Sequence, residues 1–465
     1  MHCRTADGGL PVRARLLAAA AALTVAAPAL AQSDAPSATT KADDTAIRIG
    51  DAPRPEHALG DWAGLRTRLV DQGIDLKFGY LTETMDVADG GIRQGIDYAQ
   101  QIKLQADIDL GTLAGWRGWS LHGTLLERAG RSASADYLHD DLDQVQEIFG
   151  ATDHAAGHLG QFYLEHTGGS PITLDEKAGR LPVGADFAGS PLYCQYLSLG
   201  LCPQPRGLSL EGAFSVDPSS TWGARVRGSA SGFYLMAGGY QVRPRYSGPS
   251  GFDWGFSHTT GAILPLEAGW EPRFGRRALQ GHYKAGLAFD TSNYPDLTPG
   301  GPAHGHRTAL YVLADQMLVR TGKDGTAGLI LLGGWTHGDP GTTIFRDFGF
   351  VGLSAAGLIR ARPLDSIELL VSDGEVSGVL TRAQRLAMIT NSPLPTGFPP
   401  APGSFAGPVV APGVQTREIV AEANYAVHLA SGLLVTPDVQ YVVRPAAAAS
   451  IANAFVVGAR LELNL

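Results

Sequence analysis

The feature that most constrains this chain is a strict alternation of polar and apolar residues. From Gln101 to Leu110 the two kinds follow one another without a break. Because successive side chains of a β-strand point to opposite faces, the pattern predicts a strand with one wholly polar and one wholly apolar face. The same alternation returns near the carboxyl terminus, over 417–429, 435–443 and 455–465.

The length of these runs favours a membrane protein. Strands of soluble proteins average about 5–6 residues, whereas these runs approach the ~10 residues that a tilted strand needs to cross a bilayer. The polar faces carry Lys, Arg, Asp and Glu, which suit a water-filled lumen, and the last strand stays apolar up to Leu465. After Ala31 no apolar run approaches the ~20 residues of a membrane-spanning helix. We therefore expect an all-β fold, a transmembrane antiparallel β-barrel, and keep a soluble exported protein as the alternative.

The order of charged, apolar and small residues at the amino terminus is that of a secretory signal peptide, with cleavage expected after Ala31. Further on, Trp62, Leu65 and Leu69 stand at helical spacing behind Asp61, which we expect to be the N-cap. The predicted segments are a signal peptide (1–31), a flexible segment (32–57), a short amphipathic periplasmic helix (58–73) and the barrel (74–465).

Composition excludes several classes of function. The 45 acidic residues outnumber the 36 basic ones, whereas a nucleic-acid partner requires a surplus of positive charge. The sequence contains no G-x-S-x-G, H-E-x-x-H or P-loop motif, so we expect no enzyme, cofactor or metal site. Once Cys3 has left with the signal peptide, Cys194 and Cys202 remain as an isolated pair, and in an exported chain a loop disulfide is the expected state.

The segment Gly60–Arg66, followed by Gly73 and Ile74, resembles the start of the carbohydrate-selective porin family known as OprB. The resemblance continues in Pro437–Tyr441 and Gly458–Leu461. Two positions depart from the family pattern: Ala63 replaces a usual glycine, and Leu465 stands where phenylalanine is common at the end of the last strand.

The resemblance implies a single barrel of about sixteen strands in the outer membrane of a Gram-negative bacterium. Its implied function is passive diffusion of mono- and oligosaccharides into the periplasm. It also implies that the last strand is the signal for the barrel-assembly machinery. A general or anion-preferring porin is the first alternative, and an outer-membrane or secreted hydrolase is the second. Whether protomers form a homo-oligomer stays open.

Sugars present hydroxyl groups at their edges and C–H groups on their faces, so a selective passage needs charged side chains and aromatic rings. The polar lining is expected from Glu165, Lys177, Arg180, Asp186 and Arg206, and the stacking rings from Tyr163 and Tyr193. The Gly- and Pro-rich stretch 187–208 is predicted to be a surface or infolded loop braced by the disulfide. A short amphipathic helix is predicted over 137–149, where apolar residues recur every three or four positions.

Overall fold

The computed structural model describes residues 57–148, 155–210, 214–243, 250–321, 327–397 and 410–465, all within the compact unit Thr45–Leu465. The expected signal peptide (1–31) and nearly all of the expected flexible segment (32–57) lie outside these residues. The strands are β1 (Ile74–Gly91), β2 (Gly95–Asp109), β3 (Trp119–Gly130), β4 (Ala155–Gly168), β5 (Thr173–Leu181), β6 (Thr221–Ala230), β7 (Phe233–Val242), β8 (Gly261–Trp270), β9 (Arg273–Phe274), β10 (Leu279–Asp290), β11 (Arg307–Arg320), β12 (Gly328–Gly338), β13 (Phe345–Ala356), β14 (Ser366–Val376), β15 (Arg417–Ala430), β16 (Leu433–Val443) and β17 (Ala452–Asn464).

Short helical segments occupy the connections. They are η2 (Trp62–Gly64), α1 (Leu65–Asp71), α2 (Leu110–Ala114), η3 (Ser134–Leu138), η4 (Val183–Ala185), η5 (Tyr193–Gln195), α3 (Arg206–Ser209), α4 (Gly378–Ile389) and η6 (Pro445–Ala447). Among the described residues, none of these helices is long and apolar enough to cross a membrane.

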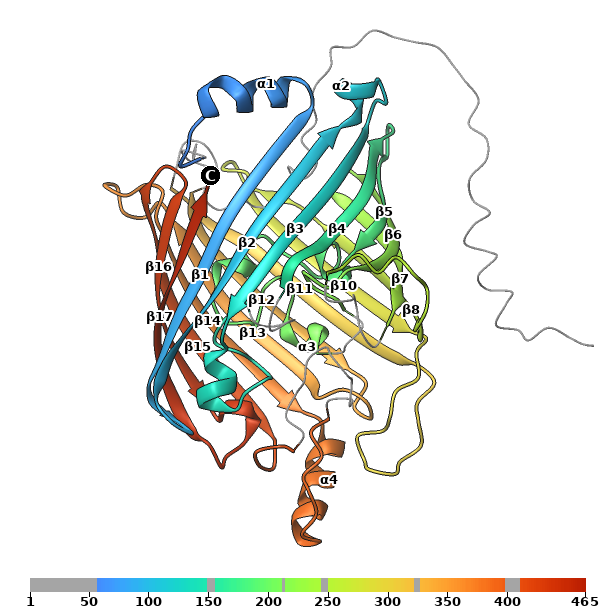
Figure 1. The fold of residues 1–465 in the computed structure, drawn as a ribbon, viewed down its shortest axis with the longest axis vertical. Coiled ribbons are helices and arrows are strands. Elements are labelled where there is room, and N and C mark those ends of the chain that lie inside the picture. Colours follow the sequence, from blue (N-terminus) through green and yellow to red (C-terminus); the bar gives the residue numbers. More distant parts are fainter. Residues whose placement is uncertain (1–56, 149–154, 211–213, 244–249, 322–326, 398–409) are drawn as a thin grey trace, which may run out of the picture. The chain divides into compact units, whose positions relative to one another are not determined.

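The sheet closes on itself (Figure 1). Strand β1 pairs antiparallel with both β2 and β17, so that Tyr80 stands opposite Ile102 on one side and Leu463 on the other. The two-residue β9 lies in the connection between β8 and β10, which also pair directly with each other. Sixteen strands therefore form the wall, and the expected antiparallel barrel is confirmed. Closure leaves no strand edge with unpaired backbone groups, as a strand crossing lipid requires.

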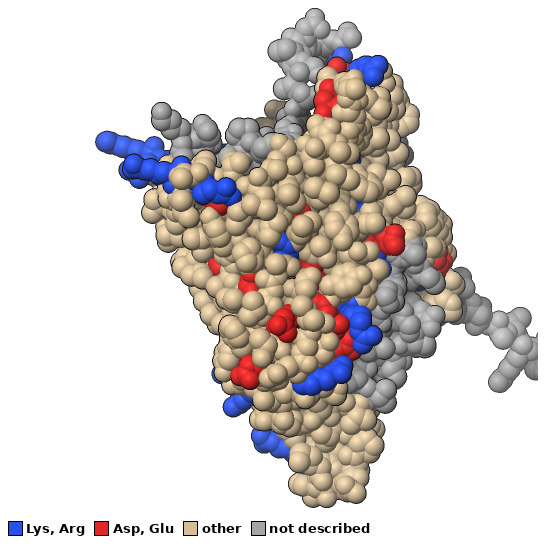
Figure 2. Space-filling model, turned by 60° about the vertical axis from the view of Figure 1, so that its left-hand side comes forward, with Lys and Arg blue, Asp and Glu red and all other residues tan. Residues whose placement is uncertain are grey.

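The apolar faces of the strands point outward. On β8, Leu264, Leu266 and Trp270 are 47%, 40% and 39% exposed, whereas Ile263 and Glu267 on the other face are 2% exposed. The same pattern recurs around the barrel, and much of the wall between the two ends is free of charge (Figure 2). An exposed apolar surface of this extent would be unfavourable in water and is stable against lipid.

Aromatic rings gather at both rims of the outer face. Trp119, Phe233 and Trp270 lie at strand ends on the side of α1 and α2 and are 39%, 58% and 39% exposed. Trp335 and Tyr441 lie near the opposite ends of their strands and are 43% and 46% exposed. Two such girdles mark the boundaries between lipid and water.

The two ends of the barrel differ. At one end, called the turn end, lie α1, α2 and the carboxyl terminus, and at the opposite end, called the loop end, lies α4 (Figure 1). The connections at the loop end are mostly long, for example 182–220 between β5 and β6, while at the turn end β6 and β7 are joined by only Ser231 and Gly232.

The amino-terminal helix begins later than expected. Its N-cap is Gly64, not Asp61, because the turn η2 intervenes. The Asp61 carboxylate still accepts a hydrogen bond from the first turn of the helix. Its Oδ1 accepts from the backbone N–H and the hydroxyl of Thr67 at 2.8 and 2.9 Å. Arg66 donates from Nη2 to the backbone oxygen of Leu465 at 2.6 Å. This contact attaches the helix to the end of the last strand.

The family departure at Ala63 coincides with a left-handed backbone, φ 56° and ψ 38°. A Cβ atom disfavours this conformation by about 1 kcal/mol. We expect Ala63→Gly to raise the hydrogen-exchange protection of the α1 amides. Ala114→Gly in α2, a helical position with negative φ, should lower protection locally and is the matched control. Unchanged or lower hydrogen-exchange protection of the α1 amides in Ala63→Gly would show that the backbone at position 63 is not strained.

Candidate solute pathway

Two connections fold into the barrel: L2 between β3 and β4 (131–154, described up to 148) and L3 between β5 and β6 (182–220). The helix predicted over 137–149 is wrong, since only η3 forms and the following residues are irregular. Its apolar residues instead anchor L2, because Leu138 and Val145 pack with Val420, Val442 and other wall residues.

The infolded loops cover one side of the lumen. Inward side chains of β12–β16 are mostly buried, and α3 of L3 lies against β12 and β13. The approach is close, since a Cβ atom on Gly207 would clash with Thr336 Oγ1. Some inward polar side chains of β1 and β2 remain partly exposed, with Lys77 at 50% and Asp107 at 19%, whereas Glu83 on β1 and Glu165 on β4 are buried. The remaining passage therefore runs along β1–β5.

Two buried carboxylates on the wall hold L3. Glu422 on β15 accepts hydrogen bonds from the backbone N–H groups of Leu197 and Ser198 at 2.6 and 3.1 Å. Glu267 on β8 accepts from the N–H of Ala188 at 2.8 Å, and also from two tyrosine hydroxyls. Charged acceptors make strong hydrogen bonds to backbone donors. L3 is thus fixed at two points on different strands.

Arg206 joins the two loops. Its side chain is 2% exposed, its Nη2 donates to the backbone oxygen of Asp141 at 2.7 Å, and its Nε donates to that of Leu142. The backbone N–H of Leu199 in turn donates to the backbone oxygen of Gln144 at 2.7 Å. These hydrogen bonds therefore hold L2 and L3 against each other.

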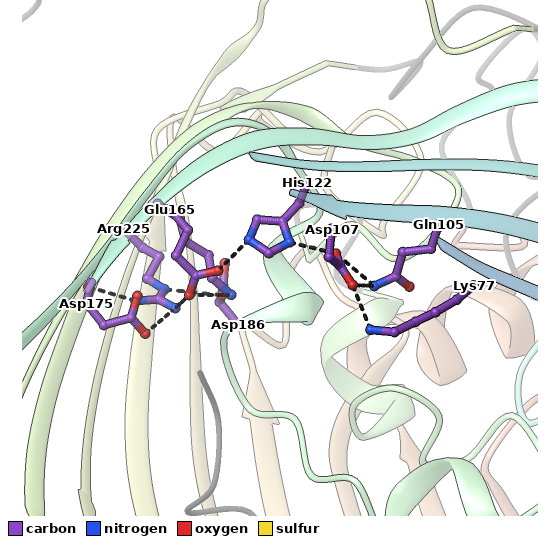
Figure 3. Close-up of polar contacts among 9 residues, drawn as sticks. Lys77, Gln105, Asp107, His122, Glu165, Asp175, Asp186 and Arg225 are labelled. Carbon is purple, nitrogen blue, oxygen red and sulfur yellow. Dashed lines mark hydrogen bonds and ion pairs between the residues drawn. The ribbon is translucent and has the colours of Figure 1, made fainter. Parts of the chain in front are cut away.

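A row of alternating charges crosses the inner wall, here called the ladder (Figure 3). It begins on β1 with Lys77, whose Nζ lies 2.7 Å from Asp107 Oδ2. Asp107 Oδ1 lies 2.7 Å from Nδ1 of His122, and Nε2 of the same ring lies 3.1 Å from Glu165 Oε2. Only a doubly protonated imidazole can donate to both carboxylates.

The ladder continues towards the loop. Lys177 and Arg225 each contact Asp186 Oδ1, at 3.1 and 3.2 Å, and approach Glu165 Oε1 at 3.9 and 3.8 Å. Asp175 completes it with a contact of 2.8 Å to Arg225. Burial alone would raise the pKa of Asp186, but the charges of Lys177 and Arg225 outweigh burial and hold the pKa of this carboxyl below its ordinary value. Asp186 therefore stays ionised.

With His122 protonated, the ladder sets four cations against four carboxylates. Asp75, whose Oδ2 lies 3.3 Å from Lys77 Nζ, adds a fifth carboxylate at its β1 end. An aromatic ring lies beside it, because Tyr163 stacks on His122 with centroids 4.6 Å apart and the planes inclined by 16°. The Nζ of Lys177 lies 5.4 Å from the centre of the same ring. The wall thus presents hydrogen-bonding groups and a ring without a large excess of either charge.

The structure brings four of the expected residues together and separates three. Glu165, Lys177, Asp186 and Tyr163 meet in or beside the ladder. The other three are buried elsewhere: Arg180 on the outer face of β5, Arg206 between L2 and L3, and Tyr193 edge-on to Phe350 with centroids 5.5 Å apart. Cys194 and Cys202 form a disulfide within L3.

Sequence reasoning did not select Lys77, Asp107, His122, Asp175 or Arg225. Strand register carries the missing signal. Asp107 pairs with His122, and Lys177 pairs with both Glu165 and Arg225. Directly opposed residues on one face are neighbours, so aligning the polar faces of consecutive hairpins would have found the ladder.

The structure provides little for a metal. Among the described residues, the one group of potential ligands close enough together comprises Glu147, Cys194 and Cys202. Both sulfur atoms belong to the disulfide, which removes them as thiolate ligands.

Asp143 makes the packing of L2 against the barrel wall sensitive to pH. It is 2% exposed in L2 and accepts a hydrogen bond from Ser372 Oγ at 2.7 Å, and burial raises the pKa of its carboxyl from 3.8 to about 7. Because the folded pKa is the higher one, the stabilisation is fully present below pH ~4 and is lost as pH rises through ~7. We expect the protection factor of the Val145 amide, which donates to Ser134 Oγ and not to a carboxylate, to fall between pH 5 and 8 after correction for intrinsic exchange. Asp143→Asn should remove this dependence, and equal protection of the wild type at both values would refute it.

A closed antiparallel barrel with an apolar outer face, two infolded loops and a charged inner wall defines a diffusion porin of the outer membrane. The chain matches the family described as carbohydrate-selective porin, OprB family, over residues 93–465, and it belongs to that family. The family, the fold and the outer-membrane location expected from the sequence are thereby confirmed.

Two relatives show the extent of the similarity. Porin B of Pseudomonas aeruginosa is 29% identical over 433 residues, which cover 88% of this chain and 92% of that protein. The structure of OprB from Pseudomonas putida at high pH superposes with a TM-score of 0.77 at 27% identity, covering 87% of this chain and 97% of the other.

Proposed function

We propose that the ladder and Tyr163 are the selective wall past which neutral sugars diffuse passively. The observation that carries the proposal is the near balance of charge on the side of the lumen where Lys77 and Asp107 stay partly exposed. A wall whose cations and carboxylates differ by one unit concentrates neither cations nor anions strongly. Its donors and acceptors can still exchange hydrogen bonds with sugar hydroxyl groups.

Weak binding suits this role, because a solute held tightly blocks its own path. The ladder groups already bond to one another, so a sugar hydroxyl replaces an existing contact and gains little net free energy. Tyr163 adds an apolar face for C–H groups, worth about 1 kcal/mol. Arg180, Arg206 and Tyr193 take no part in this wall.

Single-channel current in planar bilayers tests the proposal. Added glucose or maltose should reduce the ion current of the wild type reversibly. Tyr163→Ala should weaken this block by roughly fivefold, the equivalent of about 1 kcal/mol, and Tyr193→Ala, away from the ladder, is the control. A current indifferent to sugar would favour the general or anion-preferring porin.

The remaining expectations are part of the same proposal. Short turns of bacterial barrels face the periplasm, so α1 is placed there and the loop end faces the exterior. The protein would act without catalysis, would be exported by residues 1–31 and would present its last strand to the barrel-assembly machinery. Chemical crosslinking in native membranes would decide whether protomers associate.

A further inference from the structure

Arg180 lies on the outside of the barrel, on the face of β5 opposite to Asp175 and Lys177. Glu176 shares this outer face but pairs with His166 at 3.2 Å, nearer the turn end. Arg180 pairs with Phe162 on β4 and with Trp222 on β6. Phe162 is 41% exposed on the apolar outer face. Because Arg180 is the penultimate residue of β5, it lies at the loop end of the wall.

A strap from the connection between β7 and β8, residues 250–260, covers Arg180. The backbone oxygen of Asp253 accepts a hydrogen bond from Arg180 Nη1 at 2.9 Å. The carboxylate of the same residue pairs with Arg243 Nη2 at 2.5 Å. Trp222 fixes the strap from the wall by donating from Nε1 to the backbone oxygen of Trp254 at 3.0 Å. Two guanidinium groups thus converge on one aspartate.

Each guanidinium group has only part of its donors satisfied by the described residues. Arg180 Nη2 donates to the backbone oxygen of Ser220 at 2.7 Å, in addition to the bond from Nη1 to Asp253. Arg180 and Arg243 are 0% and 4% exposed. Within the described part of the chain, Arg180 Nε, Arg243 Nε, Arg243 Nη1 and the neighbouring hydroxyl of Ser220 have no hydrogen-bond partner. One carboxylate balances only one of the two positive charges. A buried, uncompensated cation with unsatisfied donors is unfavourable, so the arrangement calls for an additional anion.

The surroundings indicate the kind of anion. Phe252, Trp254 and Phe256 of the strap are 51%, 39% and 68% exposed, and Phe256 stacks on Trp222 with planes inclined by 14°. Exposed aromatic rings at a barrel rim lie at the depth of lipid headgroups. Planar guanidinium groups bind phosphate through paired hydrogen bonds. The site therefore combines a phosphate-binding group with an apolar rim suited to acyl chains.

We propose that Arg180 and Arg243 bind a phosphate group of a lipid in the outer leaflet, with the aromatic rings of the strap against its acyl chains. The site is on the outer face and so is independent of the ladder and of sugar selectivity. Because the loop end faces the exterior, the lipid is a phosphorylated glycolipid of the bacterial surface, held at a fixed position on the barrel.

Native mass spectrometry of the full protein in detergent tests the proposal, with purified lipid A as the probe. We expect Arg180→Gln/Arg243→Gln to lower its affinity at least about tenfold, since both charge-assisted contacts to the phosphate are lost. Arg276→Gln/Arg277→Gln, with the same change of charge in the exposed turn between β8 and β10, should bind as the wild type does.

Two further arms separate the sources of phosphate. Lipid A freed of phosphate should bind the wild type as weakly as lipid A binds the double variant, and inorganic phosphate should not compete at millimolar concentration. The proposal is overturned if the wild type binds lipid A and phosphate-free lipid A equally well, or if the wild type and the double variant bind lipid A equally well. Tight binding of inorganic phosphate would show that the bound phosphate group need not come from a lipid. If the double variant does not fold, as judged by heat-modifiable electrophoretic mobility, Arg243→Gln alone serves in its place. The block of ion current by sugar should be unchanged in every folded variant.

Discussion

Replacing Glu422 by alanine is expected to widen the pore. The Glu422 carboxylate accepts two backbone hydrogen bonds from L3, at Leu197 and Ser198. Removing it leaves both donors buried without this partner, at a cost of about 1–3 kcal/mol each. A total near 3 kcal/mol multiplies the population of undocked L3 roughly a hundredfold. Single-channel conductance and the liposome-swelling rate with maltose oligosaccharides should both rise.

The control variant also loses a carboxylate, but at a position away from L3. Glu271 pairs with Arg227 at 2.7 Å at the turn end, away from L3, so Glu271→Ala should leave the swelling rate with large oligosaccharides near that of the wild type. Glu422→Gln, which retains one acceptor oxygen, should lie between the two. If Glu422→Ala folds and its conductance equals that of the wild type, the anchoring role assigned to Glu422 is refuted.

Opposite changes of charge in the ladder are expected to give opposite ion selectivities. Lys177→Gln makes the wall more negative by one unit charge, and Asp186→Asn makes it more positive by one unit charge. One unit charge at this range changes ion energies by about 1 kcal/mol, or roughly fivefold in permeability ratio. Reversal potentials in a salt gradient should shift towards cations for Lys177→Gln and towards anions for Asp186→Asn.

Charges on the outer face supply the matched controls. Glu375 on β14 and Arg417 on β15 lie 3.9 Å apart outside the lumen. Neither Arg417→Gln nor Glu375→Gln should move the reversal potential by a comparable amount. Shifts of the same sign in Lys177→Gln and Asp186→Asn would show that the ladder does not set ion selectivity.

Part of the candidate site followed from sequence because of strand periodicity. Tyr163 and Glu165 are two residues apart on β4 and share the inner face, as expected. Lys177 and Arg180 are three residues apart on β5, so period two places them on opposite faces. Their separation in the structure therefore follows from a rule that the sequence already contained.

Loop residues did not follow in this way. Asp186, Tyr193 and Arg206 all belong to L3, where no period relates one side chain to the next. Asp186 reaches the ladder and the other two are buried behind the loop, because Glu267 and Glu422 hold the backbone of L3 at fixed points on distant strands. Such contacts join residues more than seventy positions apart.

The sequence by itself determined the barrel, since alternating faces of membrane-crossing length admit few other stable arrangements. Lipid requires every backbone group to be paired, and the outward side chains in the hydrocarbon band to be apolar. Tertiary structure alone decided how the lumen is divided. Which loops fold inward, which charges meet across neighbouring strands and which arginine lies outside depend on register and on hydrogen bonds between distant segments. Local pattern does not encode these because they are properties of the closed sheet.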